Sequence, residues 1–218
     1  MKRFVVIGLG NFGATVAEEL YAKGHDVAVL DTKEEAVDRI SRRVSRAAVG
    51  DGRQIEALER IGTKSATTAI VNTGDDVAAS ILATLALRDL GVRDIYVKVV
   101  SSDHARVMEK LGVTETVFPE RESGQLLATR ISSPGLLNYV DLGSGFSIQE
   151  MAVPDSWIGR SLRELALPRR YRISIVAIHD VLSDTIRSAP DPDAPLKESD
   201  TLLVAGRNED LAKVAESR

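Results

Sequence analysis

Hydrophobic residues in the first part of the chain alternate between short continuous runs and runs in which every fourth residue is apolar. Residues 4–7 (FVVI) are typical of a strand that is covered on both faces. Phe12, Val16 and Leu20 then follow at helical spacing. The repeated pattern predicts strands at 4–7, 27–30, 45–49, 69–71, 95–97 and 116–118, and helices near 12–20, 33–42, 53–60, 76–88, 103–111 and 120–131. This α/β alternation predicts a parallel sheet with helices on both faces.

The pattern changes after residues 132–135 (SSPG), which are typical of a break between domains. Beyond them, alternating positions at 146–153 and apolar runs further on predict a small α+β module. Its expected elements are strands at 146–153, 173–178, 185–186 and 201–205, and helices near 158–165 and 208–214. We therefore expect an N-terminal domain at 1–133, a linker or hinge at 134–142 and a C-terminal subdomain at 143–218.

The strongest chemical signal is the glycine run at residues 8–13 (GLGNFG), which follows the first strand and opens the first helix. In a Rossmann-type fold Gly8 allows the tight turn, Gly10 lets a phosphate approach the backbone, and Gly13 lets the helix pack against the sheet. Asn11 and Phe12 would then present helix N–H groups to the phosphate. The alternative is an ordinary glycine-rich turn, but the strand before it and the helix after it favour nucleotide binding.

Asp31, at the end of the second strand, stands where an acidic side chain can hold a ribose diol. Alternatively, Asp31 or Thr32 caps the next helix, with Glu34 completing a capping box. A carboxylate here would repel a 2′-phosphate, so NAD, ATP, ADP or AMP fit better than NADP. Asp51, just past the third strand, borders the expected adenosine pocket, and a turn or cap role is equally compatible with it.

Further candidate ligand residues follow the fourth and fifth strands. Thr73 and Gly74 lie where the strand order reverses, and they could approach a ribose or phosphate. A plain helix-start loop is the alternative. Lys98 ends the fifth strand and could face the same edge, although a salt-bridged surface lysine is the simpler interpretation.

Composition narrows the function classes. The 218 residues contain no cysteine, which excludes disulfide scaffolds, thiolate metal sites and cysteine nucleophiles. The three histidines, His25, His104 and His179, have no metal-binding spacing, and His104 is expected to be a solvated helix residue. The net charge of −4 includes no basic excess in either part, so no nucleic-acid partner is expected. No apolar run suggests membrane insertion, and glycines interrupt the start, so we expect a cytoplasmic protein.

The chain resembles the regulator of potassium conductance (RCK) family in several short segments. They are VIGLGNFG at 6–13, VLD at 29–31, GD at 50–51, VK at 97–98 and LGV at 111–113. FPERESG at 118–124, LNYVDL at 137–142 and DTLLVAG at 200–206 carry the likeness further. The resemblance covers nearly the whole chain. It is closest to the single-RCK cytosolic subunits of Ktr/Trk-type bacterial potassium transporters.

This resemblance implies regulation and no catalysis. RCK subunits form dimers and octameric rings on a membrane potassium-conducting partner, and an adenine nucleotide (ATP, ADP, NAD or NADH) in the N-terminal pocket changes the shape of the ring. The hinge would lie at Ser132–Gly135 and the following residues 136–139. The alternatives are a small NAD-dependent oxidoreductase, for which no catalytic residue set is evident, and a stand-alone nucleotide or metabolite sensor.

The resemblance also implies individual residue roles. Ktr-type members often carry an arginine where this chain has Asn11, so the preference for ATP is open. Glu120 matches a glutamate that can join a divalent-cation site, or it simply stabilises a helix N-terminus. The C-terminal subdomain binds cyclic di-AMP in some members. Ile173, Ile175 and Ile178 would line that site with Arg169 or Arg170 near phosphate, unless the isoleucines form the core. Trp157 is expected to be a packing anchor.

Overall fold

The computed structural model describes residues 1–132 and 136–215, and its internal contacts divide the chain into two units, Met1–Glu120 and Arg121–Arg218. The division falls near the start of helix α6 (Pro119–Ser132), whereas the sequence pattern placed the end of the first domain at residue 133. The expected elbow at 133–135 lies outside the described residues. The two units are described separately below.

The first unit is a six-stranded parallel sheet in the order β3-β2-β1-β4-β5-β6. The order reverses between β1 and β4, which makes this point the topological switch of the sheet. The strands are β1 (Arg3–Ile7), β2 (Asp26–Asp31), β3 (Arg46–Val49), β4 (Thr68–Val71), β5 (Asp94–Lys98) and β6 (Glu115–Val117). The Rossmann-type sheet predicted from the sequence is confirmed.

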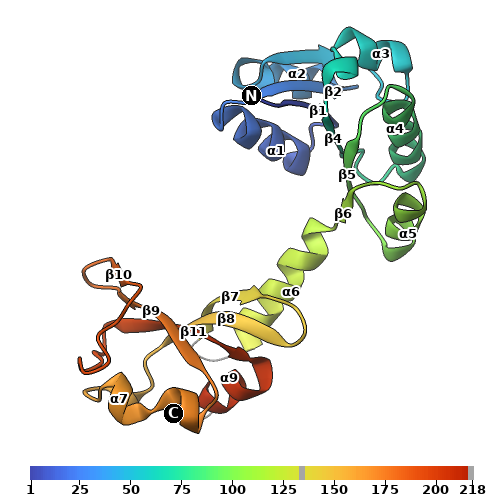
Figure 1. The fold of residues 1–218 in the computed structure, drawn as a ribbon. Helices are drawn as coiled ribbons and strands as arrows, with labels where there is room; N and C mark the ends of the chain where they lie inside the picture. Colours follow the sequence, from blue (N-terminus) through green and yellow to red (C-terminus); the bar gives the residue numbers. More distant parts are fainter. Residues whose placement is uncertain (133–135, 216–218) are drawn as a thin grey trace. The chain divides into compact units, whose positions relative to one another are not determined.

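Helices cover both faces of this sheet (Figure 1). Residues of α1 (Asn11–Ala22) and α2 (Glu34–Ile40) pack with Val6, Val27 and Val29 on one face. On the opposite face, α3 (Ile55–Arg60), α4 (Val77–Asp89) and α5 (Ser102–Lys110) pack with the neighbouring strand residues Val5 and Ile7. Alternate residues of one buried strand thus serve two cores, which is why the strands are apolar throughout.

The second unit is built on a five-stranded antiparallel sheet in the order β10-β9-β11-β8-β7. Its elements are β7 (Leu136–Asp141), β8 (Phe146–Ala152), α7 (Leu162–Leu165), α8 (Leu167–Arg170), β9 (Ser174–Asp180), β10 (Thr185–Arg187), β11 (Asp200–Arg207) and α9 (Asn208–Ala215). Its core contains Trp157, which is 2% exposed and in ring contact with Tyr171. Trp157 is the packing anchor that the sequence predicted.

The segment 134–142, expected to be a linker, contains a full strand. β7 pairs with β8 through a turn in which Leu142 N–H donates to the Phe146 carbonyl at 2.9 Å. Gly143 and Gly145 adopt positive φ angles in that turn, and Asp141 accepts the Gly143 N–H. The glycines at 143 and 145 are therefore the hairpin signal for β7, and residues 136–141 form a strand within the segment expected to be a linker or hinge.

His104 is buried, contrary to the expectation of a solvated helix position. It is 2% exposed on the inner side of α5, and neither ring nitrogen has a hydrogen-bond partner among the described residues. Burial lowers the pKa of His104 from its ordinary value of 6.5, because the low-polarity surroundings disfavour the imidazolium. The first unit therefore buries a neutral imidazole whose two ring nitrogens lose their hydrogen bonds to water and form none in the described structure, which costs stability.

Replacing His104 with leucine is expected to stabilise the first unit by about 1 kcal/mol, since two unpaired polar atoms leave the core. The unfolded chain binds the His104 proton more readily than the folded one, so stability is lost as pH falls below 6.5. The His104→Leu variant should lose less stability than the native chain as the pH falls below 6.5. Hydrogen exchange of first-unit amides in the full chain measures both effects. An unchanged acid response in His104→Leu would refute the assignment.

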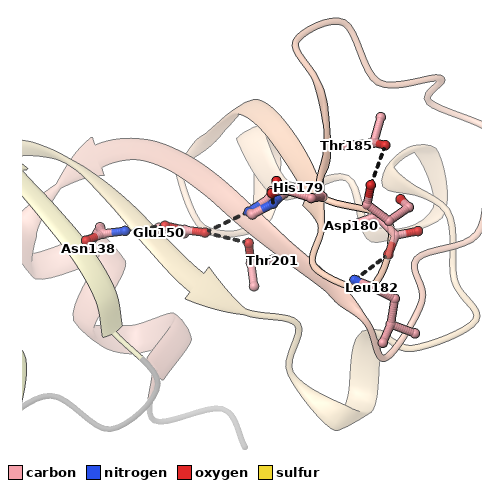
Figure 2. Close-up of polar contacts among 9 residues, drawn as sticks. Asn138, Glu150, His179, Asp180, Leu182, Thr185 and Thr201 are labelled. Atoms are coloured by element: carbon pink, nitrogen blue, oxygen red, sulfur yellow. Dashed lines mark hydrogen bonds and ion pairs between the residues drawn. The ribbon is translucent and has the colours of Figure 1, made fainter.

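A polar network crosses one face of the second sheet (Figure 2). The Glu150 carboxylate on β8 accepts hydrogen bonds from Asn138 at 2.5 Å and Thr201 at 2.7 Å, and it lies 3.4 Å from His179 Nδ1. The other ring nitrogen of His179 lies 3.1 Å from Asp184. Hydrogen bonds to Asp184 and then to Glu150 raise the pKa of His179 above 6.5. Partial burial tends to raise the pKa of Glu150, but the hydrogen bonds from Asn138, Thr201 and His179 together lower it below its ordinary value.

The variant His179→Gln should therefore cost the second unit more stability in mild acid than in mild alkali. The folded imidazolium is favoured by its two carboxylates, so this contribution is fully present below pH 6.5 and is lost as pH rises through the raised pKa. Trp157, the single tryptophan of the chain, lies in this unit, so its fluorescence reports the unfolding selectively. A stability difference that stays constant between about pH 6 and about pH 8 would contradict the ion-pair account.

Candidate nucleotide-binding site

Most of the predicted ligand residues gather at the carboxyl edge of the parallel sheet. Strand register aligns Ile7 with Leu30 on one side and with Val71 on the other, and Val71 with Val97. The residues that follow these positions in the chain, Gly8, Asp31, Asn72 and Lys98, therefore lie on neighbouring strand ends. This is the edge at which open α/β sheets bind ligands, and it includes the switch point between β1 and β4.

Gly8 and Gly13 hold the turn between β1 and α1 in close contact with the rest of the edge. Gly8 has φ +88°, and a Cβ atom there would overlap the carbonyl oxygen of Asn72. A Cβ atom on Gly13 would overlap the Gly8 carbonyl oxygen. Both positions therefore require glycine, for the structural reasons that the motif predicted.

Asn72 is a site residue that sequence reasoning missed. It is 5% exposed, its N–H donates to the Ile7 carbonyl at 2.7 Å, and its side-chain amide donates to the Gly8 carbonyl at 3.4 Å. Asn72 thus ties the end of β4 to the glycine turn. The available signal was a polar residue directly after the wholly buried strand β4.

The N-terminus of α1 is suited to an anion. Its N-cap residue is Gly10, which has no side chain to cap the helix, and the first turn contains no acidic residue. Gly10 and Asn11 are exposed, Phe12 is half-buried, and a Cβ atom on Gly10 would meet only the Asn72 side-chain amide, at 3.3 Å. The first N–H groups of this helix thus face an open, uncapped end, where a phosphate would find donors and the positive end of the helix dipole.

Asp31 links the second strand to the glycine turn. One carboxylate oxygen accepts the Leu9 N–H at 2.5 Å, and the other accepts the Lys33 N–H at 2.8 Å. Lys33 is the N-cap of α2 and makes no side-chain cap bond, so neither Asp31 nor the exposed Thr32 caps that helix. Each carboxylate oxygen can accept a second bond, which leaves Asp31 able to accept from ribose hydroxyls while it holds Leu9.

The loop after β4 is a helix-start loop, as one of the two interpretations expected. Thr73 Oγ1 donates to the Asp76 carbonyl at 2.9 Å, and the Asp76 side chain caps α4 by accepting the Ala79 N–H at 2.8 Å. Gly74 is exposed with φ +64° and has open space around it. The loop keeps an open surface at Gly74, and a contact of Thr73 or Gly74 with a nucleotide remains a prediction.

Asp51 forms the turn after β3. It accepts the Arg53 N–H at 2.9 Å and binds the Arg53 guanidinium through Nε at 2.9 Å and Nη2 at 2.6 Å. The hydrogen bond from Arg53 lowers the pKa of Asp51 from its ordinary value. The Asp51 carboxylate is therefore engaged by Arg53, a residue that the sequence analysis did not consider.

Lys98 and Glu120 form an ion pair at the start of α6. Lys98 Nζ lies 2.6 Å from a Glu120 carboxylate oxygen, and the Lys98 side chain is 14% exposed. This hydrogen bond from Lys98 lowers the pKa of Glu120. Among the residues that the structure describes, no three His, Asp or Glu side chains come together as metal ligands. A divalent cation at Glu120 would compete with Lys98 for the carboxylate.

The residues proposed for cyclic di-AMP in the second unit divide between core and surface. Ile173 and Ile178 belong to its buried core, and Ile175 packs against that core. Arg169 and Arg170 are exposed at the end of α8. The two buried isoleucines, Ile173 and Ile178, have the structural role that the sequence analysis gave as the alternative.

The described part of the chain contains no helix with both the length and the hydrophobicity needed to cross a bilayer.

Comparison with known proteins adds to this geometry. Residues 4–119 match the TrkA-N domain and residues 148–217 match the TrkA-C domain. The chain is 31% identical to Ktr system potassium uptake protein A of Bacillus subtilis, over 97% of this chain and 95% of that protein. It is 32% identical to the protein of the same name from Vibrio alginolyticus, over 99% and 97% of the two chains.

The solved structure of a GsuK channel bound to NAD superposes with a TM-score of 0.67 at 21% identity. It covers 98% of this chain, which spans 38% of that longer chain, and it supports the fold. The two domain matches correspond to the two units of the structure, and the similarity to the Ktr proteins extends over nearly the full length of the chain. The chain belongs to the TrkA-N/TrkA-C family, the regulator of potassium conductance family that its sequence motifs resemble.

Proposed function

We propose that this protein is a nucleotide-binding regulatory subunit of a membrane potassium-uptake channel or transporter. The observation that carries the proposal is the 31% identity over 97% of the chain to a Ktr system potassium uptake protein, combined with an uncapped α1 N-terminus beside Asp31. The role at the membrane would come through a partner that conducts potassium, with this subunit on the cytoplasmic side.

The ligand is an adenine nucleotide. Phosphates bind the N–H groups at the start of α1, where Gly10 leaves the backbone accessible. The ribose hydroxyls donate to Asp31, whose charge disfavours a 2′-phosphate and so favours ATP, ADP or NAD(H) over NADP(H). Asn11 supplies no positive charge for a terminal phosphate, which leaves that task to backbone donors and to Lys98.

Regulation follows from binding one conformation better than another, without turnover of the ligand. The polar side chains at the edge already serve the fold: Asp31 holds Leu9, Thr73 holds its own loop, and Lys98 holds Glu120. We place the protein in a homodimer and an octameric ring. Support comes from exposed apolar side chains of the second unit, namely Leu126, Leu127, Ile131 and Val140.

Calorimetric titration with ATP, ADP, NAD and NADH tests the pocket. Asp31→Ala should weaken the preferred nucleotide by roughly 10- to 100-fold, since it removes a hydrogen-bonded charge from the ribose site. Asp26→Ala is the matched control, because it removes a carboxylate from the opposite end of the same strand. If no adenine nucleotide binds, or if Asp31→Ala binds as tightly as Asp26→Ala, the pocket assignment fails. Repeating the titration in the presence of magnesium, with the native chain and with Glu120→Gln, tests whether Glu120 helps to bind a divalent cation.

A further inference from the structure

Arg53 occupies a distinctive place at the ligand edge. Its guanidinium donates to both carboxylate oxygens of Asp51, from Nε to Oδ1 at 3.0 Å and from Nη2 to Oδ2 at 2.6 Å, yet 48% of its side-chain surface is exposed. Such a bidentate pair fixes the orientation of the guanidinium and largely compensates its charge. The exposed part of this planar group lies in the turn between β3 and α3.

The loop that carries Arg53 packs directly on the glycine turn. Gly52 is buried, and a Cβ atom there would overlap the Ile7 side chain, immediately before Gly8. Gly50 N–H donates to the Asp31 carbonyl at 2.9 Å, which joins the same loop to the end of β2. The backbone on both sides of Asp51 is thus anchored to the strands that carry the phosphate and ribose positions.

The loop after β4 bounds this region as well. The hydrogen bond and the charge of Asp51 raise the pKa of Arg53, and the charge of Asp76 raises it further. Asp76 caps α4, and α4 packs beside α3. Arg53 itself lies in the turn between β3 and α3, and α3 is the helix beside which α4 packs.

The order of the strand ends sets the direction of a bound nucleotide. With phosphates at α1, beyond β1, and the ribose at Asp31, beyond β2, the base must extend away from the phosphates toward the end of β3. Neighbouring strands are about 4.8 Å apart, so each successive part of a nucleotide reaches one strand further. Arg53 stands at that third position.

We infer that Arg53 is a ligand-binding residue that stacks its guanidinium on the adenine ring, and that Asp51 is a positioning residue acting through Arg53. This inference rests on the proposed nucleotide site and assigns the base end of it. A guanidinium stacks well on an aromatic face, and the Asp51 pair prevents it from turning toward the phosphates. Asp51 then has no direct contact with the ligand to make.

Titration of the full chain with AMP, ADP and ATP tests the inference. Arg53→Ala should weaken all three nucleotides by the same factor, about tenfold, because the base is common to them. Arg53→Lys should restore little, since an ammonium group is not planar. Arg60→Ala is the matched control, because it removes the same charge from the other end of α3. Thermal unfolding of each variant checks that the fold is kept.

Asp51→Asn should weaken binding in the native chain and add nothing in an Arg53→Ala background, the signature of a residue acting through another. Two results overturn the inference: Arg53→Ala binding all three nucleotides like Arg60→Ala, or a loss that grows from AMP to ATP, which would make Arg53 a phosphate ligand. Failure of the native chain to bind any adenine nucleotide would instead refute the proposed function itself.

Discussion

Replacing Gly10 with aspartate is expected to weaken nucleotide binding strongly while leaving the fold at least as stable. Gly10 is the N-cap of α1, with φ −63° and ψ 176°, a backbone conformation that aspartate adopts readily. Its carboxylate would accept a hydrogen bond from the first turn and occupy the place of the phosphate. We expect a loss of affinity of about 100-fold from charge repulsion and lost donors, with a gain of a few tenths of a kcal/mol in stability.

The neutral variant Gly10→Asn separates charge from capping. Asparagine caps as well as aspartate but repels no phosphate, so its loss of affinity should be clearly smaller. Titration calorimetry and thermal unfolding on the same preparations give both quantities. Opposite signs for binding and stability would exclude misfolding as the cause, whereas unaltered affinity in Gly10→Asp would remove the phosphate from the N-terminus of α1.

Gly8→Ala is expected to produce the largest loss of stability, at least about 3 kcal/mol in the first unit. Gly8 combines φ +88° with a site at which a Cβ atom overlaps the Asn72 carbonyl. The control is Gly24→Ala, where φ is +81° but nothing lies within 4 Å of the added atom, so only the backbone strain of about 1–2 kcal/mol applies.

Denaturation followed by circular dichroism and by exchange of β1 amides measures the difference between the two alanine variants. Trp157 fluorescence reports the second unit at the same time and should change little. Equal losses for Gly8→Ala and Gly24→Ala would mean that the Asn72 contact is unimportant, and that Gly8 is required only for its backbone angle.

The sequence was most informative where one physical constraint dominates. Strands buried on both faces must be apolar throughout, so β1, β2, β4 and β5 were predictable to within a residue or two, and the helices between them follow from spacing. The glycine turn was equally readable, because Gly8 and Gly13 meet backbone atoms that no other residue would clear.

Other features depend on contacts between segments far apart in the chain. Asn72 reaches Gly8 from the end of the neighbouring strand β4, 64 residues further along the chain, and no local pattern indicates that an amide is required there. Arg53 and Asp51 are close in sequence, but the importance of their pair comes from Gly52 packing on Ile7. His104 follows a helix cap, as solvated residues often do, yet the tertiary fold turns it inward.

We propose that nucleotide binding at the glycine turn controls potassium conduction by a membrane partner. Potassium flux through that partner, reconstituted in vesicles with the native protein or with Gly10→Asp, tests it most directly. We expect that adding or exchanging adenine nucleotides changes the flux with the native protein and has no effect with the variant. A flux that ignores nucleotide with the native protein, or that responds equally with Gly10→Asp, would contradict it.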